Sequence, residues 1–342
     1  MRVAIVATSY PRAPDDAAGH FVRAEALARA RGGDEVHVIA PEPFGGDPGV
    51  RAHPAGGGAL FAWPGAASRA RRAPHLALAL GPFALRAARA LRALAPDAVV
   101  AHWLVPSAFP IALAAPASAP LEAVCHGADV RLLVRAPASA RALALGRLEA
   151  RGARLRFAAE SLREALFGAL PAGLARALAP RSRVEAPALE ALGGVRAARA
   201  ARPYVACVGR LVATKRFDVA VRALALCPPP LELRVIGEGP DRARLERVAL
   251  AAAPGRVHFH GRLGRDEALS WLAGAAALAH PSACDAAPTA VREAMALGVP
   301  VVAAEVGDTA RWAASGAPLR LAERTPEAFA AALAELAGRP AR

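Results

Sequence analysis

The chain has 342 residues, of which 55% are hydrophobic and 5% aromatic, and its formal net charge is +14. This length exceeds the roughly 100 to 200 residues of a typical domain, so we expect two domains and exclude a disordered or disulfide-stapled peptide. The chain has no Asn or Gln and one Lys among 43 basic residues, a bias typical of a GC-rich genome. Since this bias by itself produces a surplus of Arg, the charge does not indicate a nucleic-acid partner.

The cysteines and the apolar segments indicate a cytoplasmic protein. The cysteines form no C-x-x-C pair, so we expect reduced thiols and neither a zinc site nor a redox centre at Cys125, Cys207, Cys227 and Cys284. Residues 1–11 are a short apolar run followed by a polar turn, which favours a first strand over a signal peptide. Residues 98–121 carry no charged side chain but include His102 and four prolines, so we interpret them as strand, turn, helix and loop, not as a membrane span.

Short β-branched runs alternate with Ala-, Leu- and Arg-rich segments along the chain, as in βα units around buried parallel sheets. In the first half this pattern predicts strands at residues 3–7, 36–40, 98–102, 121–126 and 155–159. In the second half it predicts strands at residues 204–209, 231–237, 257–260, 276–280 and 299–303. Residues 171–202 lack a strand period, so we predict a linker region there.

The predicted fold class is α/β, with two doubly wound domains at residues 1–180 and 181–342. In open sheets of this kind, ligands bind beyond the carboxyl ends of the strands. With two such sheets those ends can face each other across a cleft. We therefore expect the chemistry in loops that directly follow strands.

Three loops of the first half carry candidate residues. The loop after the first predicted strand opens a helix at Gly19, where a phosphate could approach backbone N–H groups, or where the glycine only makes a turn. No G-x-G-x-x-G motif is present, which argues against a dinucleotide-dependent dehydrogenase. His102-Trp103 and His126-Gly-Ala-Asp129 each follow an apolar run, and each histidine has either a functional or a structural hydrogen-bonding role.

The loop at residues 209–215 is the most specific feature of the second half. It contains Lys215, the one lysine of the chain, although arginine fills every other basic position apart from histidine. A compact ammonium and a planar guanidinium differ as phosphate ligands, so a lysine kept against this composition indicates a site that needs it. We interpret Arg210 and Lys215 as a diphosphate clamp, with an ordinary solvated loop as the alternative.

Further strand exits in the second half also fit a nucleotide. Glycine at Gly237, and again before Arg262, would let a planar base lie against the backbone. A helix predicted to begin near Pro288 would direct the N–H groups of Thr289 and Ala290 outward as an anion site. Asp285 lies just before this helix and Glu293 lies within it, a spacing that suits a sugar at one end and a ribose at the other.

Taken together, these motifs resemble the family 4 retaining glycosyltransferases of the GT-B fold, also called glycosyl transferases group 1. In the second half the resemblance rests, in order, on Gly209-Arg-Leu with Lys215, Gly237-Glu-Gly-Pro, Phe259-His-Gly, and Asp285 separated by seven residues from Glu293. In the first half it rests on Ser9-Tyr-Pro-Arg through Gly19, His102-Trp and His126-Gly-Ala-Asp.

The resemblance implies two Rossmann-like domains facing across a cleft, the first on the acceptor side and the second binding a nucleotide sugar. It implies catalytic roles for His126, Asp285, Arg210 and Lys215. Arg210 and Lys215 would bind the donor diphosphate, Glu293 the ribose, Asp285 the sugar hydroxyls, and His126 would lie beside the sugar. Gly19 would approach the leaving phosphate, and the loop around Arg262 would contact the base. The donor-binding set is Gly19, Arg210, Lys215, Gly237, Arg262, Asp285, Thr289, Ala290 and Glu293.

Three positions depart from the family pattern. Asp285 stands where the family more often has Glu, which shortens the reach toward the sugar. The family's Pro-x-Gly-Val-Asp segment appears only as Glu185-Ala-Pro-Ala-Leu, and the sequence stops soon after a helix predicted at residues 326–336. These departures affect the predicted identity of the sugar and the closure of the two domains more than the predicted type of reaction.

The predicted function is that of a hexosyltransferase that moves a sugar, with retention, from a nucleotide diphosphate sugar to a hydroxyl of a sugar or lipid-linked acceptor, in surface polysaccharide or glycolipid assembly. No cofactor is expected, and no metal either, because no Asp-x-Asp occurs in the sequence. The alternatives are a nucleotide-sugar epimerase or hydrolase on the same fold, and a non-catalytic nucleotide-binding partner of an assembly complex.

A basic segment suggests where the protein works. Residues 48–96 contain no acidic side chain, and a helix predicted at residues 76–94 would bear Arg86, Arg89 and Arg92 on one side with leucines opposite. Such a face could rest on the anionic inner surface of a membrane, which would make the protein peripheral there. A solvated helix face is the alternative.

Overall fold

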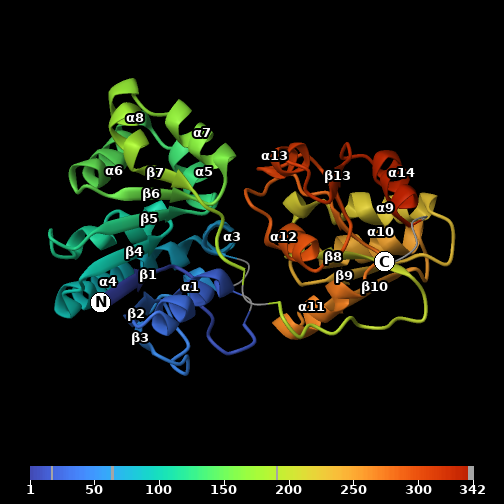
Figure 1. The fold of residues 1–342 in the computed structure, drawn as a ribbon, viewed down its shortest axis with the longest axis horizontal. Coiled ribbons are helices and arrows are strands. Elements are labelled where there is room, and N and C mark those ends of the chain that lie inside the picture. Colours follow the sequence, from blue (N-terminus) through green and yellow to red (C-terminus); the bar gives the residue numbers. More distant parts are fainter. Residues whose placement is uncertain (17, 63–64, 190–191, 338–342) are drawn as a thin grey trace. The chain divides into compact units, whose positions relative to one another are not determined.

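The computed structural model describes residues 1–16, 18–62, 65–189 and 192–337. The chain divides into two compact units, Met1–Glu190 and Ala191–Arg342. In each unit a parallel sheet lies between layers of helices (Figure 1). The predicted α/β class with two doubly wound sheets is therefore confirmed.

The sheet of the first unit has seven strands in the order β3-β2-β1-β4-β5-β6-β7, and all neighbouring strands are parallel. The central strands are buried on both faces, which is why they consist of short runs of Val, Ile and Ala. The strands are β1 (Arg2–Val6), β2 (Glu35–Ala40), β3 (Val50–Pro54), β4 (Ala98–His102), β5 (Leu121–Cys125), β6 (Arg154–Phe157) and β7 (Ser182–Val184).

The longer helices of the first unit bury apolar side chains against the sheet. In α4 (Leu80–Leu94) these are Phe83, Ala87 and Leu91, four residues apart. The other helices are α1 (His20–Arg31), α2 (Gly58–Phe61), α3 (Ala66–Arg72), α5 (Ala128–Arg135), α6 (Ala138–Ala150), α7 (Glu160–Gly168) and α8 (Ala172–Leu178). The crossover from β4 to β5 differs from the others, because it has only the short helical turns η2 (Leu104–Ala108) and η3 (Ile111–Ala114). Two further turns are η1 (Pro74–Ala79) and η4 (Ala179–Arg181).

The sheet of the second unit has six parallel strands in the order β10-β9-β8-β11-β12-β13. They are β8 (Tyr204–Val208), β9 (Glu232–Ile236), β10 (Val257–Gly261), β11 (Ala277–His280), β12 (Val301–Ala303) and β13 (Leu319–Leu321). The helical segments are η5 (Ala213–Lys215), α9 (Phe217–Leu226), α10 (Arg242–Ala252), α11 (Arg265–Ala273), α12 (Thr289–Ala296), α13 (Thr309–Ala314) and α14 (Pro326–Ala337). Helix α14 packs against α9 through a core that includes Phe329, Leu333 and Phe217.

All ten predicted strands are present, with ends that differ by at most two residues, but three strands were not predicted. These are β3, β7 and β13, each at the edge of its sheet. The predicted linker at residues 171–202 is wrong in its first part, since it contains α8 and β7. Because β7 pairs with β6, the first unit extends to Glu190 and does not end at the predicted boundary after residue 180.

Each sheet has one point at which the strand order reverses. In the first unit this point lies between β1 and β4, and in the second between β8 and β11. The loops after these neighbouring strands diverge there, which leaves room for a ligand at the carboxyl edge of the sheet. Residues 98–121 form β4, η2, η3 and the start of β5, so the predicted strand is present and short helical turns stand where a helix was predicted. No helix among the described residues is long and apolar enough to cross a membrane.

Candidate functional site

In the second unit, the loops after β8 and β9 pack backbone against backbone. Gly237 has φ +136°, and a Cβ there would lie 2.0 Å from the carbonyl oxygen of Gly209. A Cβ at Gly239 would lie 2.3 Å from the carbonyl oxygen of Leu211, whose N–H donates to the carbonyl of Glu238 over 2.8 Å. The predicted Gly237 therefore has a structural role, because only a glycine lets these two loops meet.

Lys215 and Asp285 form an ion pair at the point where this sheet reverses its strand order. Lys215 follows β8 and Asp285 follows β11, and Nζ of Lys215 lies 2.9 Å from Oδ2 and 3.1 Å from Oδ1 of Asp285. His280, the last residue of β11, places its Nε2 3.0 Å from the same Oδ2. The sequence prediction singled out Lys215 and Asp285 but neither their contact nor the role of His280.

The electrostatics of this group keep Asp285 ionised. Burial alone would raise its pKa, but the ammonium of Lys215 and the hydrogen bond from His280 outweigh burial and hold the pKa well below its usual value. Burial lowers the pKa of His280, whose hydrogen bond to Asp285 acts in the opposite direction. His280 is therefore neutral near pH 7 and donates its Nε2 proton to the carboxylate.

Glu293 lies on α12 and forms a second buried ion pair. Its Oε1 accepts a hydrogen bond of 2.7 Å from Nη1 of Arg265, in the first turn of α11, and the Glu293 side chain is 8% exposed. This partner was not predicted, because one arginine among so many gives no signal in the sequence. The predicted anion site at Thr289 and Ala290 forms the first turn of α12, and both residues are half-buried.

The other predicted residues of this unit lie in loops at the same edge of the sheet. Arg210 follows β8 and Arg262 follows β10, and both side chains are exposed. Their position at strand ends agrees with the prediction. Ligand binding by these two residues stays a prediction.

In the first unit, Gly19 precedes α1 in a tight turn. Its φ is +74°, and a Cβ would lie 2.6 Å from the carbonyl oxygen of Ser9, so this position requires glycine. The loop is anchored at Asp47, which accepts a hydrogen bond of 2.6 Å from the Tyr10 hydroxyl and a pair of contacts, of 2.6 and 2.7 Å, from Arg23. The loop after β1 is thus held in a defined shape beside the start of α1.

His102 and His126 lie edge to edge at the ends of β4 and β5. Their ring planes are 10° apart, and Nδ1 of His102 lies 2.9 Å from Nε2 of His126. Phe21 and Trp103 contact the His126 ring, with centroids 4.7 and 4.9 Å away. Two histidines predicted from separate strands therefore form one cluster.

Asp129 fixes the loop that carries His126. Its carboxylate is buried and accepts hydrogen bonds from the backbone N–H groups of Leu104, His126 and Gly127, over 2.8, 3.2 and 2.9 Å. Burial raises the pKa of Asp129, although these N–H groups act against that effect. Asp129 has a structural role, since all its contacts hold the two loops together.

Both histidines of the cluster are neutral near pH 7. Burial lowers the pKa of His102 to about 3. Burial, and then the neighbouring His102, hold the pKa of His126 well below its usual value of 6.5. A neutral imidazole can accept a hydrogen bond from a hydroxyl group, which an imidazolium cannot.

The described residues contain no cluster of three or more His, Cys, Asp or Glu side chains that could hold a metal ion. The four cysteines are free thiols, and Cys125, Cys207 and Cys227 are buried. Burial raises the pKa of each of these three thiols. The candidate site therefore consists of charged side chains, histidines and backbone loops.

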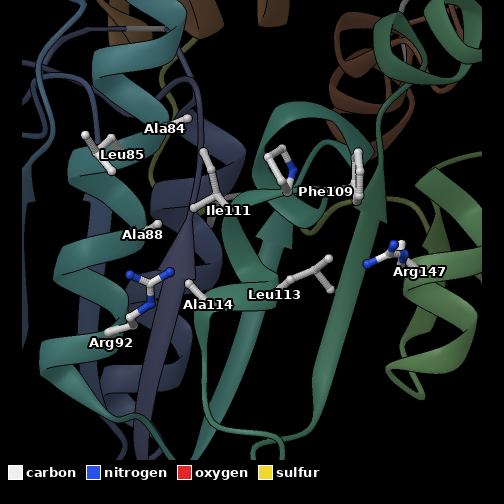
Figure 2. Close-up of a pocket in the computed structure, with 10 residues that line it drawn as sticks. Ala84, Leu85, Ala88, Arg92, Phe109, Ile111, Leu113, Ala114 and Arg147 are labelled. Carbon is white, nitrogen blue, oxygen red and sulfur yellow. The ribbon is translucent and has the colours of Figure 1, made fainter. Parts of the chain in front are cut away.

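The short crossover between β4 and β5 leaves an open groove on the first unit. Its volume is about 480 Å³, and Figure 2 shows Arg92 of α4 and Arg147 of α6 at its two sides with Leu113 and Ala114 between them. Leu85 also lines the groove and is 50% exposed. Within the described residues, the side chains of Arg92 and Arg147 have no ion-pair or hydrogen-bond partner.

Comparisons with known sequences match parts of the chain. Residues 202–339 match the model of the family described as glycosyl transferases group 1. A GDP-mannose-dependent alpha-(1-6)-phosphatidylinositol dimannoside mannosyltransferase of Mycobacterium tuberculosis is 34% identical over 140 residues, which are 39% of this chain and 35% of that protein. A GDP-mannose-dependent alpha-mannosyltransferase of Mycolicibacterium smegmatis is 33% identical over 106 residues, 31% of this chain and 26% of the relative. The matches thus span between about a quarter and about a third of the length of these relatives.

Solved structures match nearly the whole chain at low identity. HepE of Anabaena in complex with UDP has a TM-score of 0.70 at 16% identity, covering 98% of this chain and 89% of that one. Sucrose-phosphate synthase of Thermosynechococcus elongatus has a TM-score of 0.73 at 20% identity, covering 98% and 90%. WaaG, a glycosyltransferase involved in lipopolysaccharide biosynthesis, has a TM-score of 0.68 at 17% identity, covering 98% and 92%. At these identities the likeness shows the fold, which is the GT-B fold of two Rossmann-like units.

Proposed function

Because residues 202–339 match the model of the glycosyl transferases group 1 family, we propose that the protein transfers a sugar from a nucleotide diphosphate sugar to an acceptor hydroxyl, with retention at the anomeric carbon. The observation that carries this proposal is the pair of Lys215 and Asp285 at the strand-order reversal of the second sheet. The ammonium of Lys215 can bind an anion, and the carboxylate of Asp285 can accept hydrogen bonds from hydroxyls.

The charges of this group suit a nucleotide sugar. Lys215, with Arg210 in the same loop, would neutralise the diphosphate as it leaves, which is the largest charge change in the reaction. Asp285 stays ionised and would accept hydrogen bonds from the sugar, while His280 holds its carboxylate in place. Glu293, oriented by Arg265, would accept hydrogen bonds from the ribose hydroxyls.

The remaining donor contacts would come from the backbone and from the first unit. The N–H groups of Thr289 and Ala290 would contact a phosphate, and Arg262 the base. His126 and Gly19 would contact the sugar and the leaving phosphate, as the family resemblance implies. Cationic side chains and helix N–H groups would thus neutralise the diphosphate, as a metal ion does in other enzymes. We therefore propose that no cofactor is needed.

We propose a lipid-linked or sugar acceptor in glycolipid or surface polysaccharide assembly, with the protein in the cytoplasm and in peripheral contact with the membrane. A matched relative is by name a mannosyltransferase of phosphatidylinositol dimannoside, and WaaG is a glycosyltransferase of lipopolysaccharide biosynthesis. The exposed Leu85, Arg89 and Arg92 of α4, together with the groove in Figure 2, offer apolar and cationic groups to an anionic lipid surface.

One part of the basic face differs from its prediction. The predicted helix at residues 76–94 is the turn η1 followed by α4, and Arg86, although exposed, is partly engaged within the protein. Its Nε donates to the carbonyl oxygen of Ala55 over 2.6 Å, so it ties α4 to the loop after β3. Arg89 and Arg92 stay exposed on the same helix.

The experiment that tests the function is a thermal-shift panel of nucleotide sugars, followed by product analysis with the donor that binds best. We expect one donor to raise Tm and to glycosylate an acceptor hydroxyl. A rearranged donor sugar would favour the epimerase, and a cleaved donor without a glycosylated product the hydrolase. Donor binding without any reaction would favour a non-catalytic nucleotide-binding partner.

A further inference from the structure

In the first unit, the side chains of Glu25, His102 and His126 lie in a row. Oε2 of Glu25, on α1, lies 3.5 Å from Nε2 of His102, an electrostatic contact that is too long for a hydrogen bond, and this buried Nε2 has no hydrogen-bond partner among the described residues. Nδ1 of His102 lies 2.9 Å from Nε2 of His126. His102 is 1% exposed, so water does not compete for its nitrogens. The other charges facing His102 are Arg156 and Arg29.

One proton lies between the facing nitrogens of the two rings, which are 2.9 Å apart, and the carboxylate of Glu25 favours one of the two nitrogens as its carrier. If Nε2 of His102 were bare, its lone pair would point at a carboxylate, which is repulsive. With the proton on Nε2, His102 has its lone pair on Nδ1 and must accept the hydrogen bond from His126. His126 then carries its proton on Nε2 and has a lone pair on Nδ1.

We propose that Glu25 and His102 are positioning residues that hold His126 in the Nε2-protonated tautomer, so that its Nδ1 accepts a hydrogen bond from a substrate hydroxyl. Within the described residues, the ring of His126 makes its hydrogen bond through Nε2, to His102, and none through Nδ1. The identity of the hydroxyl as a sugar group rests on the proposed function, but the tautomer does not.

The tautomer matters for the proposed reaction because the sugar gains positive charge at its anomeric carbon as the diphosphate leaves. A neutral ring with a lone pair can orient a hydroxyl beside that carbon, whereas the positive charge of an imidazolium would repel the positively charged carbon. Burial of both rings disfavours the imidazolium, as their lowered pKa values indicate. Arg156 also faces the rings and is held by the carboxylates of Glu25 and Glu122.

The direct test is ¹⁵N NMR of the histidine side chains in the full-length protein, with His126 assigned by the spectrum of His126→Ala. We expect a pyridine-type Nδ1 and a pyrrole-type Nε2 for His126 at neutral pH. The reverse pattern, or a protonated ring, would overturn the proposal. This readout does not depend on transferase activity, so it stands even if the proposed function fails.

The role of Glu25 is tested with a matched pair of variants. Glu25→Gln and Glu122→Gln each remove one carboxylate from Arg156, but only Glu25 faces His102. We expect Glu25→Gln to give a mixture of His126 tautomers and to lower kcat about tenfold, the rate equivalent of one net hydrogen bond, with little change in KM for the donor. Glu122→Gln should retain the tautomer. If both variants changed the His126 tautomer and kcat equally, Glu25 would act only by holding Arg156, and the proposal would be wrong.

Discussion

Nζ of Lys215 lies 2.9 Å from Oδ2 of Asp285, so the one lysine of the chain neutralises a carboxylate that comes 70 residues later in the sequence. The two residues belong to loops after neighbouring strands at which the sheet reverses its strand order. Their pairing places opposite charges, each less than 20% exposed, at the edge where this fold class binds ligands.

The first prediction concerns Lys215. We expect Lys215→Ala to lower turnover about 100- to 1000-fold, because it removes a charge that stabilises the leaving diphosphate. Arg222→Ala, on the exposed side of α9, removes the same charge elsewhere and should retain full activity. Steady-state kinetics check both. Near-native turnover in Lys215→Ala would show that Lys215 has no role in catalysis. Unchanged turnover in Lys215→Arg would show that an ammonium is not required there.

The second prediction concerns Gly237. A Cβ there would meet the carbonyl oxygen of Gly209 at 2.0 Å, whereas Gly255, also at a positive φ, has open space around it. We expect Gly255→Ala to cost about 1 to 2 kcal/mol of unfolding free energy from backbone strain. Gly237→Ala should cost about 1 to 3 kcal/mol more, since it overpacks two loops, and it should weaken donor binding. Denaturant unfolding measures both variants, and equal costs would contradict the close packing of these loops.

The third prediction concerns acid stability. His102 is buried with its pKa lowered to about 3, whereas the same side chain in the unfolded chain takes up a proton near 6.5. As the pH falls below 6.5, protonation favours the unfolded chain, so the unfolding free energy falls by up to about 1.4 kcal/mol per pH unit for this residue. The contribution of neutral His102 to the unfolding free energy is fully present above pH 6.5 and is lost progressively as the pH falls to about 3.

Urea unfolding from neutral pH downwards checks this sign. His102→Phe keeps an aromatic ring in the core and should have a shallower pH dependence than the original chain. His75→Phe, at an exposed position, is the control and should leave the slope unchanged. An unchanged slope in His102→Phe would mean that His102 is not the buried neutral group described above.

The fourth prediction concerns the membrane. In cosedimentation we expect binding to anionic vesicles at low salt, little binding to neutral vesicles, and loss of binding as salt rises. Arg89→Glu combined with Arg92→Glu should abolish the preference, since each arginine contributes about 1 kcal/mol at an anionic surface. Arg222→Glu, on the second unit, should not. Equal binding to neutral and anionic vesicles would contradict the membrane proposal.

The central strands could be predicted from the sequence because burial on both faces demands runs such as Val3 to Ala7. The edge strands β3, β7 and β13 have one neighbour each and carry exposed arginines at Arg51, Arg183 and Arg320, so no apolar run marks them. Strand β7 has three residues, too few for any period, and this shifted the predicted domain boundary.

The site could be predicted where residue type stands out against the composition, as at Lys215, or where motifs occur in order, as at Asp285 and Glu293. Its supporting partners could not. Arg265 contacts Glu293 across 28 residues, and Glu25 lies in the middle of α1 with no motif around it. Such contacts depend on how helices pack onto the sheet, which spacing along the chain does not encode.

The central claim is retention of configuration in sugar transfer, and product NMR tests it most directly. The purified protein, exhaustively chelated, is incubated with its preferred nucleotide sugar and a hydroxyl acceptor, and the configuration of the new glycosidic bond is compared with that of the donor. We predict transfer with the donor's anomeric configuration retained and a rate unchanged by chelation. An inverted product, or transfer that occurs only when magnesium or manganese is restored, would contradict the account.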